Sequence, residues 1–354
     1  MLGKLFGKAK TSEPTPPSPS RTVINDQISS TTSDLARETI AHALRSNAID
    51  DGGSEKLFYN FLFSDSGQAK EPNALEEDIL LRVNALLDDP KASLDRFPPL
   101  PKSIAKLVDV LGKDDFVLME FLDIVKEEPP VASAIIKVAN SATYNQSGKP
   151  IVDLTKAFMS IGAAGVKETV LMAFVRQFSQ IKTIYFKAFG DKIWQHSQHT
   201  ANLTKQLAEK KQADKEAGFF IGLVHDMGKI VIFRIMVDAF KVADPEHTPG
   251  SVVFKKMLSE KSMQLSLELA QHWKMPTNIS NAIYDLLNLG KEPPATALGE
   301  ALAEANLISE LWLMHQAKRL GEEELQAIIE SAEMSDEAID LLHQTIQSEA
   351  QELN

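Results

Sequence analysis

The chain has 354 residues and a formal net charge of −12, and it contains no cysteine. This length and a hydrophobic fraction of 44% predict a folded protein of two or three packed units. An acidic surface repels phosphate backbones, and no basic stripe interleaved with aromatic residues is present, so nucleic acid is a disfavoured partner. The lack of cysteine excludes disulfides, thiolate-bound zinc, iron–sulfur clusters and a cysteine nucleophile, and it fits a cytoplasmic location.

The N-terminal region begins with a tail, residues 1–21, whose second half is rich in proline and serine and is expected to be flexible. Its first ten residues are expected to form a disordered basic segment, with weak contact to an anionic membrane as the alternative. They do not form the apolar run of a secretory signal, and no run approaches the roughly 18 apolar residues of a membrane span. Residues 22–95 are predicted to form an N-terminal helical unit without identifiable chemistry.

Three prolines interrupt any helix at Phe97-Pro98-Pro99-Leu100-Pro101, so the chain must restart there. Short amphipathic helices are expected next, up to about residue 150. The segment Asn140-Ser141-Ala142 could suggest a nucleophilic serine, but it is better explained as a helix end held by side-chain bonds to the backbone. Gly162 and Gly165 predict a tight junction before an apolar run from Val166 to Phe178.

Helical periodicity dominates the remainder of the chain, and strand patterns are nearly absent. The predicted fold is therefore all-α, a multi-helix bundle. The expected helices cover about 184–211, 215–224, 229–240, 250–260, 263–272, 277–289, 295–318, 322–332 and 336–350.

Two histidines on the long predicted helix fall on different faces. His196 shares the apolar face with Ile193 and Leu203, whereas His199 falls with polar residues on the opposite face. We therefore expect His196 to point into the fold and His199 to face solvent. An inward histidine is more often a hydrogen-bonded core residue than a metal ligand.

The pair His225–Asp226 ends an apolar helix, where an unpartnered carboxylate would cost several kcal/mol to bury. One explanation is a divalent metal ion, because imidazole nitrogen and carboxylate oxygen are its usual ligands. The alternative is structural, with Asp226 capping the helix that begins near Lys229 and holding His225 by a hydrogen bond.

Several blocks of sequence resemble known families. Two blocks resemble the HD superfamily of metal-dependent phosphohydrolases: His196-Ser197-x-x-Thr200-Ala201 and Gly222-Leu223-Val224-His225-Asp226-Met227-Gly228-Lys229. Over about residues 97–290 the chain resembles the HDOD family (HD-related output domain). The blocks that carry this resemblance are the proline block, Ala139-Asn140-Ser141-Ala142-x-Tyr144, Ala157 to Gly162, and Trp273-Lys274-Met275-Pro276. The resemblance implies an HDOD domain over 96–292, with an N-terminal half (96–183) and an HD-like half (184–292). The C-terminal helices at 293–354 follow, and the first of them is expected to complete the HD-like bundle.

The resemblance also implies a site and a function. The family is a helical regulatory module of bacterial signalling that is generally regarded as having lost hydrolase activity. Its metal ligands would be His196, His225 and Asp226, but Asn306 stands where a further aspartate is expected, and Glu304 is a poor substitute. Tyr284-Asp285 stands where cyclic-dinucleotide-cleaving relatives carry paired histidines.

Two main hypotheses remain open. The first is a non-catalytic signalling module that binds a protein partner or a small ligand. The second is a metal-dependent phosphohydrolase acting on a nucleotide or phosphodiester, with a divalent metal as its cofactor. In the phosphohydrolase, Lys229 is the candidate phosphate-binding residue. In the non-catalytic module, it is expected to be a surface or capping lysine. A membrane-surface or scaffold role led by the N-terminal tail ranks last.

Overall fold

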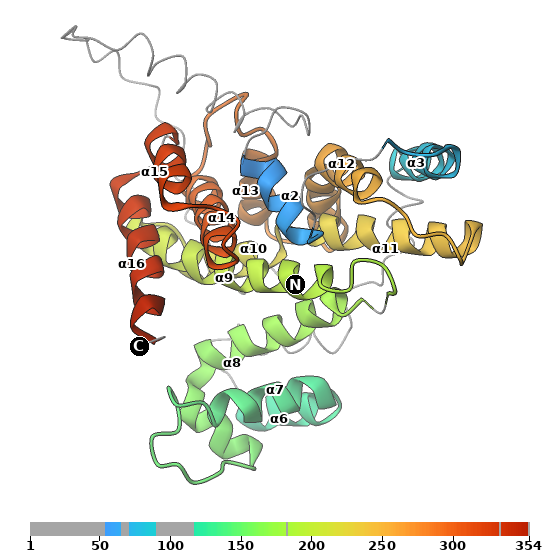
Figure 1. Cartoon of the computed structure of the whole chain (residues 1–354). Coiled ribbons are helices and arrows are strands. Elements are labelled where there is room, and N and C mark those ends of the chain that lie inside the picture. Colours follow the sequence, from blue (N-terminus) through green and yellow to red (C-terminus); the bar gives the residue numbers. More distant parts are fainter. Residues whose placement is uncertain (1–53, 65–70, 90–116, 182, 333, 353–354) are drawn as a thin grey trace, which may run out of the picture.

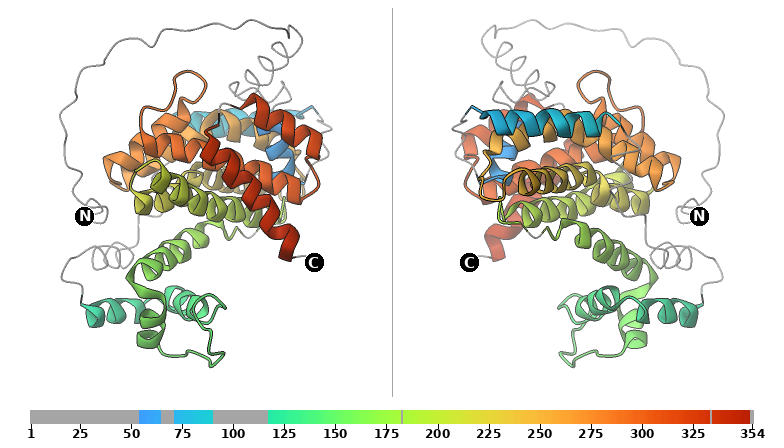
Figure 2. Two further views of the ribbon diagram at one scale, coloured as in Figure 1. Left: turned by 90° about the vertical axis from the view of Figure 1, so that its left-hand side faces the viewer. Right: turned by 90° about the vertical axis from the view of Figure 1, so that its right-hand side faces the viewer.

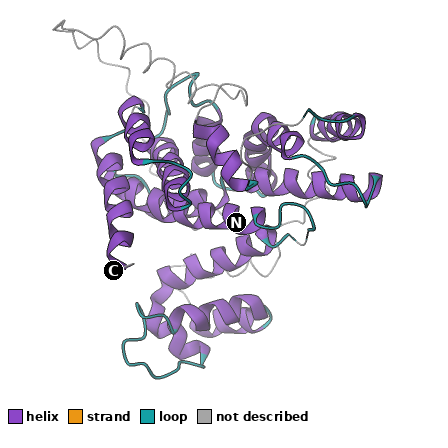
Figure 3. Cartoon of the chain, viewed as in Figure 1, coloured by secondary structure: helices purple, strands orange, loops and turns teal. Residues whose placement is uncertain are grey.

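The computed structural model describes residues 54–64, 71–89, 117–181, 183–332 and 334–352. These residues form helices joined by turns and loops, without a strand among them, which confirms the all-α fold (Figure 3). The expected tail at 1–21, the part of the N-terminal unit before residue 54 and the proline block at 97–101 lie outside the described residues.

The helices follow the predicted order closely. They are α2 (Ser54–Leu62), α3 (Ala74–Leu87), α6 (Leu118–Lys126), α7 (Pro129–Ala139), α8 (Leu154–Ser179), α9 (Phe189–Lys210), α10 (Lys215–Val224), α11 (Met227–Ala243), α12 (Ser251–His272), α13 (Thr277–Leu287), α14 (Ala297–Gln316), α15 (Glu322–Ser331) and α16 (Asp336–Glu352). The two helices expected at 250–260 and 263–272 are one continuous helix, α12. The residues between them, Lys261 and Ser262, include neither glycine nor proline, so nothing interrupts the helix.

The molecule has a large bundle and a smaller lobe. Helices α6 and α7 and the first part of α8 form the lobe, and the rest of α8 connects it to the bundle (Figures 1 and 2). The junction expected at Gly162 is a break inside α8, where this residue has φ 79°. By length and composition alone α8 could cross a membrane, but half of its apolar window is buried inside the fold.

Asn140 and Ser141 have the structural role expected of them in the lobe. Asn140 follows α7, and its Nδ2 donates hydrogen bonds to the carbonyl oxygens of Ile136 and Ile151 at 2.9 and 2.6 Å. The Ser141 hydroxyl donates to the carbonyl oxygen of Val138 at 2.7 Å. These bonds close the helix and hold the following loop, and they leave no activated nucleophile at Ser141.

The bundle is built around α9, which packs against α10 on one side and α14 on the other. Helices α11 and α12 pack as a pair, and α13 lies between α12 and α14. The short α2 contacts both α14 and α9, and its Phe58 and Leu62 are each only 1% exposed. These packings bring residues from distant parts of the chain together in the interior of the bundle.

Candidate metal centre beneath helix α2

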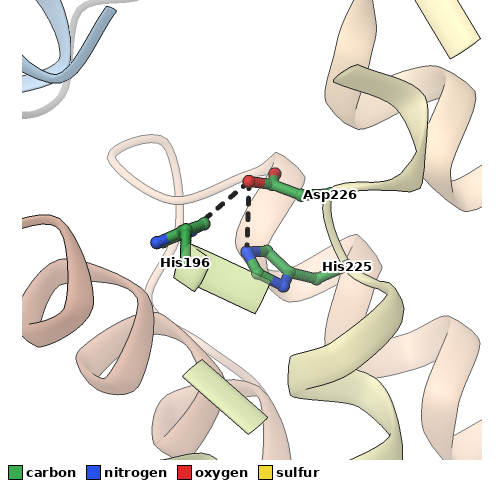
Figure 4. A group of neighbouring side chains, drawn as sticks. All are labelled: His196, His225 and Asp226. Atoms are coloured by element: carbon green, nitrogen blue, oxygen red, sulfur yellow. Dashed lines mark ion pairs between the residues drawn. The ribbon is translucent and has the colours of Figure 1, made fainter. Parts of the chain in front are cut away.

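His196, His225 and Asp226 come together as a single buried group (Figure 4). His196 lies on α9, His225 ends α10, and Asp226 is the residue before α11. One oxygen of Asp226, Oδ2, lies 3.3 Å from His196 Nε2 and 3.5 Å from His225 Nε2. The donor atoms of the three residues all lie within 4.8 Å of one another, which is the spacing of a group that could hold one metal ion.

Two glycines allow the helices to approach closely enough to form this group. A Cβ atom on Gly222 would lie 2.7 Å from the Cα of Ala201, so α9 and α10 meet backbone to backbone beside His196 and His225. A Cβ atom on Gly228 would lie 1.9 Å from the carbonyl oxygen of Ser262, which brings the start of α11 against α12. Both positions therefore exclude any larger side chain.

The alternative role for Asp226, as the residue that caps the following helix, is only partly found in the structure. Asp226 occupies the N-cap position of α11, but its side chain makes no capping hydrogen bond. The carboxylate turns instead toward the two imidazoles and toward Lys229. The residue thus sits where a cap would sit without acting as one.

The imidazole of His225 is fixed by the backbone. Its Nδ1 lies 2.8 Å from the carbonyl oxygen of Gly222, which can only accept, so Nδ1 carries a hydrogen. His196 is oriented by Ser309, whose hydroxyl lies 3.0 Å from Nδ1 and donates to the His196 carbonyl oxygen. In the neutral rings, this arrangement directs both Nε2 lone pairs into the group.

Asn306 on α14 completes the set of donor atoms. Its Oδ1 lies 3.0 Å from His225 Nε2 and 3.2 Å from His196 Nε2. A tetrahedral zinc ion with ligands at about 2.0–2.1 Å separates neighbouring donor atoms by about 3.3 Å. The four separations along this ring of atoms, 3.0–3.5 Å, are therefore close to those of a four-coordinate site. The residues fit a single divalent ion.

Burial sets the protonation states that such an ion requires. Desolvation lowers the pKa of His196 to about 4 and also lowers that of His225. Burial alone would raise the pKa of Asp226, but the neighbouring His225 and Lys229 hold it well below its usual value. The group therefore presents neutral imidazoles and an ionised carboxylate at neutral pH, the forms that bind metal.

Lys229 is not the surface or capping lysine that the sequence suggested as one alternative. It is only 6% exposed, its Nζ donates to Asp226 Oδ2 at 2.8 Å, and it also lies 2.8 Å from Oδ1. The ammonium stands over the rings of Phe58 and Tyr59 at 5.7 and 5.9 Å from their centres. Its charge is thus directed at Asp226, and whether it binds phosphate remains a prediction.

Helix α2 covers the group, a role that the sequence gave no reason to expect. The ring of Phe58 lies 4.9 Å from that of His196, centre to centre. At the start of the helix, burial raises the pKa of Glu55, whose carboxyl group interacts electrostatically with Lys229 and Asp226. His196, His225 and Asp226 are 0%, 0% and 1% exposed as a result.

Glu310 lies close to the group and was not identified from the sequence. It lies one helical turn after Asn306, and its Oε1 accepts a hydrogen bond from Asn306 Nδ2 at 3.2 Å. Burial raises the pKa of Glu310 to about 8. The signal was available, because residues four apart on a helix face each other.

The other acidic positions singled out in the sequence lie elsewhere. Glu304, the poor substitute, pairs with Lys211 at 3.0 Å and accepts from the backbone of Ser335. Asp285 accepts two hydrogen bonds from Thr296 at the start of α14. These carboxylates stabilise helix ends and helix pairs and do not join the metal group.

His199 departs from the expected position in solvent. Its ring lies 4.0 Å from that of Trp312, centre to centre, and desolvation lowers the pKa of His199 to about 4. Helix α14 covers this face of α9 as well, because its tryptophan reaches over the polar side of the helix.

The chain was compared with known proteins. The HDOD domain family matches residues 97–286, more than half of the chain. Among curated proteins, none matches.

Two solved structures share the fold. One, from Geobacter sulfurreducens, is described as an HDOD domain protein with unknown function; it is 19% identical, with a TM-score of 0.53 over 76% of this chain and 96% of that one. Another, from Shewanella amazonensis, is described as a "putative metal-dependent phosphohydrolase"; it is 19% identical, with a TM-score of 0.52 over 78% of this chain and 99% of that one. At this identity the likeness concerns the fold alone. The family match over residues 97–286 shows that the chain belongs to the HDOD family.

Proposed function

We propose that this protein is a non-catalytic signal-transduction module that acts by binding a protein partner or a small ligand. The observation that supports the proposal is the burial of His196, His225 and Asp226, which closes this group to solvent. Hydrolysis of a phosphate ester requires that substrate and water reach the same point, and the three residues are 0%, 0% and 1% exposed. The ring of Phe58 packs against that of His196 and helps to cover the group.

Helix α2 is too firmly held to serve as a routine gate. Phe58, Tyr59, Leu62 and Phe63 are all at most 5% exposed. Exposing a side chain of this size costs about 1.5–3 kcal/mol, so moving the helix away would cost several kcal/mol. Lys255 also bonds Asn60 of α2 at 2.6 Å. The energy needed to open the site is of the same order as the stability of a whole domain.

A metal-dependent phosphohydrolase is the second candidate, and the grouping of two histidines with an aspartate, residues that could hold a metal ion, favours it. His196, His225, Asp226 and Asn306 would hold a divalent ion, which lowers the pKa of a bound water so that it can attack a phosphate ester. Four protein ligands leave no position for that water in a tetrahedral site, which is typical of structural metal centres. Lys229 would have to leave Asp226 to bind a phosphate.

Hydrolysis assays separate the two candidates. The full chain would be purified without chelator, supplied with Mn²⁺ or Zn²⁺, and assayed with nucleotides and with bis(p-nitrophenyl) phosphate. The proposal predicts no turnover above that of His225→Ala. Turnover that requires metal and disappears in His225→Ala would replace the proposal with the phosphohydrolase.

A cavity lies on the surface away from this group. It has a volume of about 350 Å³ and lies between the end of α8 and α11, lined by Gln180, Ile181, Arg234, Val237, Asp238 and Lys241. It shares no residue with the metal-type group. A small ligand of the proposed signalling module could therefore bind without entering the sealed site.

A further inference from the structure

The two oxygens of Asp226 face different surroundings. Oδ2 is directed at the imidazoles of His196 and His225, as Figure 4 shows, while the second oxygen points away from both rings. The ammonium of Lys229 lies 2.8 Å from each of the two oxygens, so it pairs with Oδ1 and shares Oδ2 with the imidazoles.

Lys229 is buried in this position. Its side chain is 8% exposed, and its Nζ lies over the rings of Phe58 and Tyr59 on α2. It is three residues after Asp226, so the first turn of α11 holds the two side chains on one face. Helix geometry and the aromatic cover therefore both keep the ammonium against the carboxylate.

Acidic residues from other helices also act on Lys229. Besides Asp226, the carboxyl groups of Glu310 and Glu55 act on it electrostatically. Glu310 comes from α14, where its Oε1 accepts from Asn306 Nδ2 at 3.2 Å, and Glu55 comes from α2.

The geometry points to Lys229 as a built-in cation that occupies the place of a second metal ion, so that this buried group can hold at most one divalent ion, on the histidine side of Asp226. Lys229 thereby stabilises the buried carboxylate without any metal. This inference concerns how many cations the group accepts, and it stands whether or not the protein hydrolyses a substrate.

The test is the number of metal ions bound by the full-length chain. Wild type, Lys229→Met and Lys167→Met would each be equilibrated with Mn²⁺ and counted by native mass spectrometry and elemental analysis. Lys167 is the matched control, because it is also a buried lysine paired with a carboxylate, Glu216, at 2.8 Å. Lys229→Met would be expected to bind one Mn²⁺ more than the wild type, and Lys167→Met the same number as the wild type.

A second readout is thermal stability. Lys229→Met removes the cation from a buried carboxylate, and an unpaired buried charge destabilises the folded state. Its melting temperature should fall in chelator and recover with Mn²⁺, whereas that of Lys167→Met should fall without recovering.

Two results would overturn the inference. One is a wild-type chain that binds two divalent ions in the group, which would show that Lys229 does not exclude a second metal ion. The other is a folded Lys229→Met protein with the wild-type metal content. If Lys229→Met folds in neither condition, the wild-type count decides, with none or one ion supporting the inference and two refuting it.

Discussion

The amide of Asn306 is held between Glu310 and His225. Its Nδ2 donates to Glu310 Oε1 at 3.2 Å, and its Oδ1 lies 3.0 Å from His225 Nε2. Because His225 Nδ1 donates to the backbone, its Nε2 presents a lone pair, and two acceptors face each other. A cation between them, or a reversed amide donating to Nε2, removes this conflict. We therefore expect the residue at position 306 to influence the affinity of this group for a metal ion.

Asn306→Asp should increase the affinity for Mn²⁺ by about tenfold or more, a gain of about 1.4 kcal/mol from one added negative charge. The same change should lower the melting temperature in chelator, because a second buried carboxylate then lies near Asp226. Calorimetric titration with Mn²⁺ and thermal melting measure the two effects. Asn306→Ala, which removes the oxygen, is the control and should bind more weakly than wild type. An affinity of Asn306→Asp no higher than that of wild type would rule out residue 306 as a ligand.

Glu310 should make the metal-free protein less stable as the pH rises. Burial raises its pKa to about 8, whereas in the unfolded chain it has an ordinary value near 4.5. Between these values the folded state binds more protons than the unfolded state, so the free energy of unfolding falls with increasing pH. Glu310→Gln should flatten this slope in urea titrations from pH 6 to about 8.5. Glu304→Gln, a change at another buried glutamate of α14, should keep it. An unchanged slope in Glu310→Gln would contradict the assignment.

Phe58→Ala should open the cover over His196 and cost about 3–5 kcal/mol of stability, as for other large-to-small changes in a core. Because desolvation lowers the pKa of His196 to about 4, water admitted by the substitution should bring that pKa back toward 6.5. An NMR titration of the imidazole measures it. Phe61→Ala, on the same helix, should reduce stability without moving the pKa of His196. Equal pKa values in both variants would show that Phe58 does not seal the site.

Gly222→Ala should be strongly destabilising, because its Cβ would lie 2.7 Å from backbone atoms of α9. Overpacking of this kind typically costs about 1–3 kcal/mol, and here the atoms that must move are backbone. Gly250→Ala is the matched control, since its Cβ would meet only Glu76 Oε1 at 3.5 Å and its φ is −71°. Chemical denaturation compares the two. Equal stability of the two variants would mean that α9 and α10 can separate without loss.

The sequence was sufficient for the parts of the site that depend on local pattern. Helical spacing placed His196 on a buried face, and the apolar helix before His225–Asp226 predicted that the pair would be buried. It could not show that α2 covers the site, because periodicity identifies an apolar face but not the distant segment that packs on it. The same limit explains His199, whose polar side of α9 is covered by Trp312.

The burial of Lys229 against Asp226, and the presence of Glu310 beside Asn306, were missed for a different reason. Each of these two residues lies within one helical turn of a residue already singled out, Asp226 and Asn306 respectively, so spacing alone would have paired them. A buried lysine or glutamate is uncommon, so a surface or capping position was the alternative offered for Lys229, and Glu310 was not considered. Their burial follows from α2 and α14 closing over the group, which is long-range packing.

The sealed state of the group can be measured directly by chemical modification. Diethyl pyrocarbonate reacts with neutral imidazoles that solvent can reach, and mass spectrometry can follow each histidine of the folded chain. His272 and His343 are exposed and serve as internal references, while His196 and His225 are 0% exposed. We predict rapid modification of the two references and modification of the buried pair only on unfolding. Reaction of His196 at the rate of His343 would contradict a sealed site and would show that a substrate can enter.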